Sequence, residues 1–191
     1  RVIIDEADRL RSLVDRMLGP NKALKLAPTN IHEILERVGT LLEAESKGRL
    51  NFERDYDPSI PEFKGDKEQL IQAFLNIARN AMEAAFENQA SHSSDEPPTI
   101  TFRTRTLRQF TIGNRRHRLV CRVDVIDNGP GIPPELVQNI FYPMISGRAS
   151  GTGLGLSITQ SIIGQNRGLV ECESEPGRTD FIIFLPLEDT P

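Results

Sequence analysis

Two short glycine-containing segments are the parts of this chain best suited to hold a phosphorylated ligand. The first, Asp-Asn-Gly-Pro-Gly-Ile at 127–132, follows an alternating apolar run and so places the Asp127 carboxylate at a strand end. The second, Gly-Thr-Gly-Leu-Gly-Leu at 151–156, opens an amphipathic segment. Bare backbone N–H groups at a helix start bind phosphate without a basic side chain. Together the two segments indicate a nucleotide site.

In the first segment, the Asp127 carboxylate can accept a hydrogen bond from the exocyclic amine of adenine. Gly129 and Gly131 would let the base approach the backbone, and Ile132 closes the segment. The alternative is a plain Asx turn, because Asp-Asn-Gly is a strong turn signal. The segment alone does not decide between these two interpretations.

A polar stripe within residues 66–88 is the next candidate. Asn76, Asn80 and Glu83 are spaced i, i+4 and i+7, which puts two carboxamides and a carboxylate on one helix face. Carboxamide oxygens can ligate Mg²⁺ beside phosphates, because this ion prefers oxygen donors and keeps several waters. Taken alone, the stripe is better explained as an exposed polar face. It becomes informative beside the two glycine segments.

Residues 133–150 lie between the glycine segments and are interpreted as a lid. A segment with glycines at both ends can close over a ligand, and Arg148 could then reach a terminal phosphate. The alternative is a surface loop with a solvated arginine. Phe141 and Tyr142 are expected to pack the lid onto the core rather than stack on a base.

The elements that must position these residues alternate between helices and antiparallel hairpins, without a regular βαβ repeat. Helices are predicted over 30–46, 66–88 and 152–165. Strands are predicted over 50–56, 99–108, 117–126, 168–174 and 180–186. Asn30 with Glu33 forms a capping-box pattern, and Asp66 with Gln69 opens the second helix. The fold class is therefore α+β, a two-layer α/β sandwich.

Composition excludes several classes of protein. The 191 residues are 38% hydrophobic and carry a net charge of −4, whereas a general nucleic-acid binder needs a basic surplus. The arginines between 103 and 118 are therefore interpreted as a solvated, charge-balanced hairpin. Apolar runs stay short of membrane-spanning length. Cys121 and Cys172 are interpreted as small buried hydrophobes of a reducing compartment, so a cytoplasmic location is expected.

The order of these segments resembles the nucleotide-binding boxes of sensor histidine kinases. Residues 76–85 look like the N box, 127–132 like the G1 box, 141–144 like the F box and 151–156 like the G2 box. Residues 177–181 resemble the closing G3 element, although Arg178 stands where a second glycine is common. The resemblance implies the Bergerat (GHKL) ATP-binding fold with ATP and Mg²⁺ as cofactors.

The resemblance also implies roles for individual residues. Asn80 would ligate Mg²⁺ with help from Asn76, and Thr179 would contact the adenine side through water. Arg148 joins the two asparagines as a candidate catalytic residue. The full candidate ATP-binding set is Asn76, Asn80, Glu83, Asp127, Gly129, Gly131, Ile132, Arg148, Gly151, Thr152, Gly153, Leu154, Gly155, Leu156 and Thr179.

Domain organisation follows from the same resemblance. Residues 1–19 carry a helical a/d pattern and would be the C-terminal helix of a dimerisation and phosphoacceptor hairpin, followed by a linker at 20–29 and the catalytic domain at 30–191. The chain has no starting Met, so we expect a fragment of a longer protein, a homodimer at full length. The acceptor histidine would lie upstream. His32, His92 and His117 are interpreted as surface residues.

Asn76 distinguishes two reactions within this fold. Gyrase-like and chaperone ATPases resemble one another in placing a glutamate at this position, and a carboxamide cannot take a proton from water. Phosphoryl transfer to histidine is therefore favoured over hydrolysis. The alternatives are a GHKL-type ATPase and an ATP-binding regulatory module without transfer.

The segment 141–156 is similar, more narrowly, to nitrogen-regulation sensor kinases of the NtrB type. That similarity implies two protein partners for the full-length molecule. They are an NtrC-type response regulator and a PII-type signal protein.

Overall fold

The structure is a computed structural model that describes residues 23–91, 96–145 and 153–188. Its helices are α2 (Ile31–Ser46), α3 (Lys67–Ser91), α4 (Pro134–Val137) and α5 (Gly155–Gln165). Its strands are β1 (Ala27–Thr29), β2 (Asn51–Asp55), β3 (Phe63–Gly65), β4 (Thr99–Ile112), β5 (Arg115–Asp127), β6 (Leu169–Glu175) and β7 (Arg178–Pro186). Within the described ranges, no helix is both long and apolar enough to cross a bilayer.

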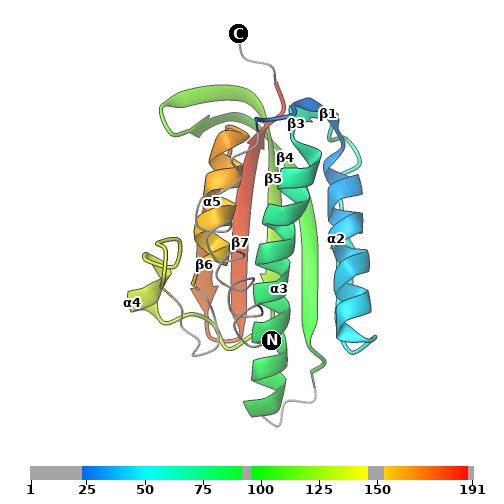
Figure 1. The fold of residues 1–191 in the computed structure, drawn as a ribbon, viewed down its shortest axis with the longest axis vertical. Coiled ribbons are helices and arrows are strands. Elements are labelled where there is room, and N and C mark those ends of the chain that lie inside the picture. Colours follow the sequence, from blue (N-terminus) through cyan, green and yellow to red (C-terminus); the bar gives the residue numbers. More distant parts are fainter. Residues whose placement is uncertain (1–22, 92–95, 146–152, 189–191) are drawn as a thin grey trace, which may run out of the picture.

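Helices α2, α3 and α5 form one layer and a five-stranded sheet forms the other (Figure 1). The strand order is β2-β4-β5-β7-β6, with β2 parallel to β4 and the other pairs antiparallel. The main core lies between these layers, where α3 packs between α2 and α5. The predicted α+β two-layer sandwich is confirmed.

Helix α2 forms because its apolar residues recur on one face and a polar residue caps its start. Asn30 Oδ1 accepts a hydrogen bond from the His32 N–H at 2.9 Å, so the predicted cap is confirmed. The capping-box role of Glu33 is not seen: its carboxylate contacts Lys67 Nζ at 2.8 Å. A lysine within reach on α3 offers this exposed side chain an ion pair instead.

Helix α3 carries the polar stripe and is the central element of the helical layer. Asp66 Oδ1 accepts from the Gln69 N–H at 3.1 Å, which confirms the predicted helix start. The helix continues to Ser91, beyond the predicted end near residue 88. One face is fully buried, with Leu70, Phe74, Ile77, Ala78 and Ala81 in the core.

Strands β4 and β5 form a longer hairpin than predicted, with the turn at 113–114 as expected (Figure 1). The tip folds back on β7, where the Phe110 and Phe184 rings stack with centroids 4.5 Å apart. His117 is only 5% exposed, so its interpretation as a surface residue is wrong. It is the register partner of Phe110, the residue that stacks on Phe184.

Strands β1 and β3 form a small two-stranded sheet that the sequence did not predict. The Thr29 hydroxyl lies within hydrogen-bond distance of the Ala27 carbonyl, at 2.8 Å, and of the Gly65 carbonyl on the partner strand, at 3.1 Å. Each strand has three residues, too few for an alternating pattern to be visible. Residues 27–29, expected in the linker, are therefore part of this sheet.

Candidate functional site

A cavity of about 780 Å³ opens between α3, the end of β5, the start of α5 and β7. Ten of the predicted binding residues line it: Asn76, Asn80, Glu83, Asp127, Gly131, Ile132, Gly153, Gly155, Leu156 and Thr179. Gly129 and Leu154 lie beside the cavity but not on its wall. Arg148, Gly151 and Thr152 lie outside the described residues. The fold thus gathers residues from four separate segments.

The α3 wall presents Asn76, Asn80 and Glu83 along one side of the cavity. Asn76 Nδ2 donates to the carbonyl of Gly155 at 3.4 Å, which joins α3 to the first residue of α5. That first turn has no side-chain cap, because the residue before it is Leu154. A helix start with uncapped N–H groups suits an anionic ligand, and two carboxamides stand next to it.

Asp127 and Thr179 form the opposite end of the cavity. They are register partners in the β5–β7 ladder, and they are 2% and 3% exposed. One carboxylate oxygen of Asp127 accepts from the Gly129 N–H at 2.8 Å, as an Asx turn would. The turn and the site interpretation are compatible, because Asp127 also lines the cavity. A buried acceptor beside a hydroxyl can recognise the polar edge of a base.

Ser174 on β6 holds this end together, and the sequence analysis missed it. Its Oγ accepts from the Ile132 N–H at 2.8 Å and lies 2.8 Å from Thr179 Oγ1. A serine in an edge strand carries no chemical signal in the sequence. Its position opposite Thr179, known only from the strand register, reveals the contact.

Two glycines of the site have different surroundings. A Cβ at Gly129 would lie 2.6 Å from Asp127 Oδ1 and 2.7 Å from Ala84 Cβ, so a side chain is excluded by packing. A Cβ at Gly155 would meet nothing within 4 Å. Gly155 therefore borders open space in the cavity, whereas Gly129 lets the first segment pack on α3.

A backbone hydrogen bond joins the predicted lid to the glycine segment that follows it. The Met144 N–H donates to the Gly153 carbonyl at 3.0 Å. Phe141 packs edge-on against Phe181 with centroids 6.3 Å apart, as predicted. Tyr142 is 61% exposed, so the expectation that it also packs on the core is wrong. The backbone turns between these neighbours and directs the Tyr142 ring to solvent.

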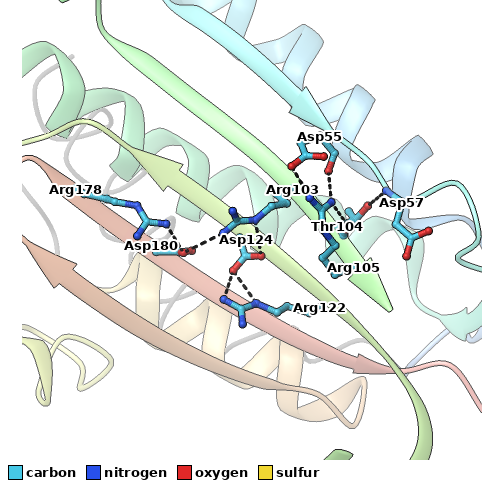
Figure 2. Close-up of polar contacts among 9 residues, drawn as sticks. All are labelled: Asp55, Asp57, Arg103, Thr104, Arg105, Arg122, Asp124, Arg178 and Asp180. Atoms are coloured by element: carbon cyan, nitrogen blue, oxygen red, sulfur yellow. Dashed lines mark hydrogen bonds and ion pairs between the residues drawn. The ribbon is translucent and has the colours of Figure 1, made fainter. Parts of the chain in front are cut away.

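The face of the sheet away from the helices carries an ion-pair network (Figure 2). Asp124 accepts from Arg103 at 3.3 Å and from Arg122 at 2.7 Å, and Arg178 contacts Asp180 at 3.2 Å. Three of the hairpin arginines predicted to be charge-balanced have ion pairs: Arg103 with Asp124, Arg105 with Asp55 and Arg118 with Glu188. Burial and then the nearby Asp124 charge raise the pKa of Asp180 to about 6.

The remaining chemical groups have structural surroundings. Cys121 and Cys172 are both free, and burial raises the pKa of each thiol to about 12. Cys121 is fully buried as predicted, while Cys172 is partly exposed. Within the described ranges, His, Cys, Asp and Glu side chains form no group of three or more that could hold a metal.

A helical layer on one sheet face, with a cavity that joins a buried carboxylate, carboxamides and a helix start, defines a nucleotide-binding α+β sandwich domain. The sequence profile described as "Histidine kinase-, DNA gyrase B-, and HSP90-like ATPase" matches residues 65–189. The chain belongs to this family.

Relatives with similar sequences narrow the family to its histidine kinases. The Sensory histidine kinase/phosphatase NtrB of Vibrio alginolyticus is 52% identical over 186 residues, which cover 97% of this chain and 51% of the relative. NtrB of Salmonella typhimurium is 49% identical, covering 98% of this chain and 51% of the relative. The chain spans about half the length of these curated relatives.

Solved structures agree with this placement. The catalytic domain of histidine kinase ThkA has a TM-score of 0.68 at 26% identity, covering 85% of this chain and 96% of that chain. Histidine kinase ThkA in complex with response regulator protein TrrA has a TM-score of 0.70 at 25% identity. The match covers 98% of this chain and 50% of that chain. The family resemblance of the boxes and the fold it implied are confirmed.

Proposed function

We propose that this chain binds Mg-ATP in the cavity and transfers the γ-phosphoryl group to a histidine on a separate helical-hairpin domain. The observation that carries the proposal is the pairing of Asn76 with the start of α5, at the end of the cavity opposite Asp127. Phosphates drawn to that helix start would lie beside carboxamides, which position and neutralise charge without acting as a base.

The base and phosphates have distinct places in this proposal. Asp127 accepts from the adenine amine, and Thr179 contacts the same edge of the base. The segment 151–156 holds the phosphates through its backbone N–H groups, and Arg148 reaches the terminal phosphate. The open space at Gly155 supports this orientation.

The residues present fit a metal ion that enters with the nucleotide. Asn80 would be its protein ligand, with Asn76 assisting and Glu83 one helical turn further along. The described residues supply two carboxamides and this carboxylate rather than an acidic cluster. Mg²⁺ often takes few protein oxygens and completes its shell with phosphates and water. Such an ion would neutralise charge on the triphosphate.

Hydrolysis is the competing reaction for this fold. A general base for water would have to stand near the phosphates, and the side chain of α3 that contacts the first residue of α5 is the carboxamide of Asn76. Glu83 lies two helical turns away on α3, toward the Asp127 end of the cavity wall. Transfer to a delivered histidine is therefore favoured over transfer to water.

The partners of the full-length protein are proposed from its relatives. Identity near 50% to NtrB proteins supports a nitrogen-regulation kinase that acts on an NtrC-type response regulator and responds to a PII-type protein. The ThkA–TrrA complex supports a response regulator as partner. A homodimer, a cytoplasmic location, a hairpin helix at 1–19 and a linker that ends before β1 complete the proposal.

One experiment separates the three candidate activities. The chain is incubated with γ-labelled Mg-ATP and a separate hairpin domain that carries the acceptor histidine, with a histidine-free hairpin as control. Acid-labile label on the first hairpin alone is expected. Rapid release of inorganic phosphate without the acceptor would identify an ATPase. Nucleotide binding with neither outcome would identify a regulatory module.

A further inference from the structure

We propose that Ser174 is a positioning residue that makes Thr179 a hydrogen-bond donor and so favours adenine over guanine. This inference rests on the proposed function, because it assumes that the base lies against Asp127 and Thr179. Ser174 does not line the cavity, whereas Thr179 and Ile132 do. It would therefore act through those two residues.

The contacts of the Ser174 hydroxyl restrict where its single hydrogen can go. The Ile132 N–H donates to Ser174 Oγ at 2.8 Å. Two acceptors then compete for the Ser174 hydrogen: Thr179 Oγ1 at 2.8 Å and the Arg178 carbonyl at 3.4 Å. Hydroxyl hydrogen bonds cluster at about 2.7–2.8 Å and weaken beyond 3.0 Å. The opposite arrangement, in which Thr179 donates to Ser174, leaves the Ser174 hydrogen only the Arg178 carbonyl at 3.4 Å. When the Thr179 hydrogen has an acceptor in the cavity, the arrangement with Ser174 as donor keeps the stronger set of bonds, and we assign the hydrogen to Thr179 on that ground.

This assignment determines what Thr179 can offer a ligand. With one lone pair already accepting from Ser174, the Thr179 hydroxyl retains its own hydrogen for the cavity. The hydrogen bond that the Ile132 N–H donates to Ser174 polarises the serine hydroxyl. This polarisation strengthens the hydrogen bond from Ser174 to Thr179. Asp127, the register partner of Thr179, contributes an acceptor at the same end of the cavity.

An acceptor beside a donor matches adenine, whose edge presents an amine at C6 and an unprotonated N1. Guanine presents the reverse, a carbonyl at C6 and an N1–H. Thr179 must also be a donor if a water lies between it and N1. Such a water would donate one hydrogen to Asp127 and the other to N1, so it could only accept from Thr179. For Thr179 to accept from a guanine N1–H, its own hydrogen would have to turn to Ser174 Oγ, and the Ser174 hydrogen would then have only the Arg178 carbonyl at 3.4 Å. Ser174 thus makes that arrangement less favourable.

The test compares ADP with 1-deaza-ADP, in which carbon replaces the N1 acceptor, and with GDP. Calorimetry on the 191-residue chain is expected to show ADP binding about tenfold more tightly than 1-deaza-ADP, the value of one hydrogen bond. In Ser174→Ala this ratio should fall to about twofold, and the preference for ADP over GDP should narrow. Ser174→Thr keeps the hydroxyl and should restore both ratios.

Controls distinguish positioning from general damage. Ser59→Ala removes a serine hydroxyl bonded to Asp57 outside the cavity and should change neither ratio. If Ser174→Ala weakens ADP and 1-deaza-ADP equally, or leaves both unchanged, the positioning role is overturned while the ATP site stands. If the unmodified chain fails to bind ADP, or binds ADP and GDP alike, the proposed function falls and the role of Ser174 falls with it.

Discussion

Asp127 and Thr179 stand directly opposite each other in the antiparallel β5–β7 ladder, so a buried carboxylate and a buried hydroxyl meet at one end of the cavity. They are 52 positions apart in the chain. Their meeting depends on the register of two strands that each carry a glycine-containing turn. The proposed nucleotide site depends on that register. The role of each of its hydrogen-bonding residues can be tested by substitution.

Asp127→Asn should weaken ADP binding by about 30-fold or more, because an amide N–H₂ would oppose the adenine amine. The fold should survive, since the new carbonyl oxygen can still accept from the Gly129 N–H. Isothermal calorimetry measures the affinity, and thermal unfolding of the same samples checks the fold. Equal ADP affinity in a folded variant would remove Asp127 from the base site.

Gly129→Ala and Gly155→Ala form a matched pair that separates folding from binding. At Gly129 the new Cβ would collide with Ala84 and Asp127, so the free energy of unfolding should fall by about 1–3 kcal/mol. At Gly155 it would enter open space at a helix start, so stability should stay within about 1 kcal/mol of the original.

ATP affinity gives the complementary readout for this pair. Gly155→Ala should weaken ATP binding severalfold more than adenosine binding, because the added methyl group occupies space assigned to phosphate. Urea unfolding and calorimetry with ATP and with adenosine are carried out on both variants and on the original chain. A Gly155→Ala chain with unchanged ATP affinity would place the phosphates elsewhere.

Asn80→Asp should slow Mg²⁺-dependent phosphoryl transfer by at least about tenfold, because the added negative charge faces the triphosphate and alters the metal shell. Gln89→Glu is the matched control, since it adds the same charge to α3 outside the cavity. Transfer rates at several Mg²⁺ concentrations are compared. Normal rates in Asn80→Asp would exclude Asn80 from the site.

Asp180 should make stability depend on pH in an unusual direction. Burial and the Asp124 charge raise its pKa to about 6, so the folded chain binds this proton more tightly than the unfolded chain. The contribution of Asp180 is therefore most favourable at low pH and declines as pH rises from about 4 through about 6.

Asp180→Asn removes this titration while keeping the side-chain size. The free energy of unfolding of the variant minus that of the original chain should increase by about 1–3 kcal/mol from pH 5 to pH 7.5. Arg103 and Arg178 reduce the gain, because both also contact the charged form. Urea unfolding at the two pH values measures it. If the two chains differed in free energy of unfolding by the same amount at both pH values, the raised pKa of Asp180 would be contradicted.

Much of the fold could be predicted from the sequence because apolar periodicity and caps are local signals. Asn30 and Asp66 begin their helices as predicted, and Asp127 ends its strand. The candidate binding residues could be proposed because glycine clusters and a carboxamide stripe are rare in combination. Their assembly in one cavity then required the sheet order.

The residues that sequence reasoning missed depend on contacts between distant segments. Ser174 is unremarkable in its own strand and gains importance only from Thr179 and Ile132. His117 is buried in a hairpin that is longer than predicted, where it pairs with Phe110 on the neighbouring strand. Glu33 forms an ion pair with Lys67, on another helix, instead of the predicted capping contact.

A single-turnover reaction that quantifies both possible products gives the most direct test of phosphoryl transfer by this domain. The chain is loaded with γ-labelled Mg-ATP, mixed with excess histidine-bearing hairpin domain and quenched in alkali. Phosphohistidine should appear first, and inorganic phosphate only later as the phosphohistidine decays. Phosphate appearing first, and at the same rate without the hairpin, would show that the cavity hydrolyses ATP instead.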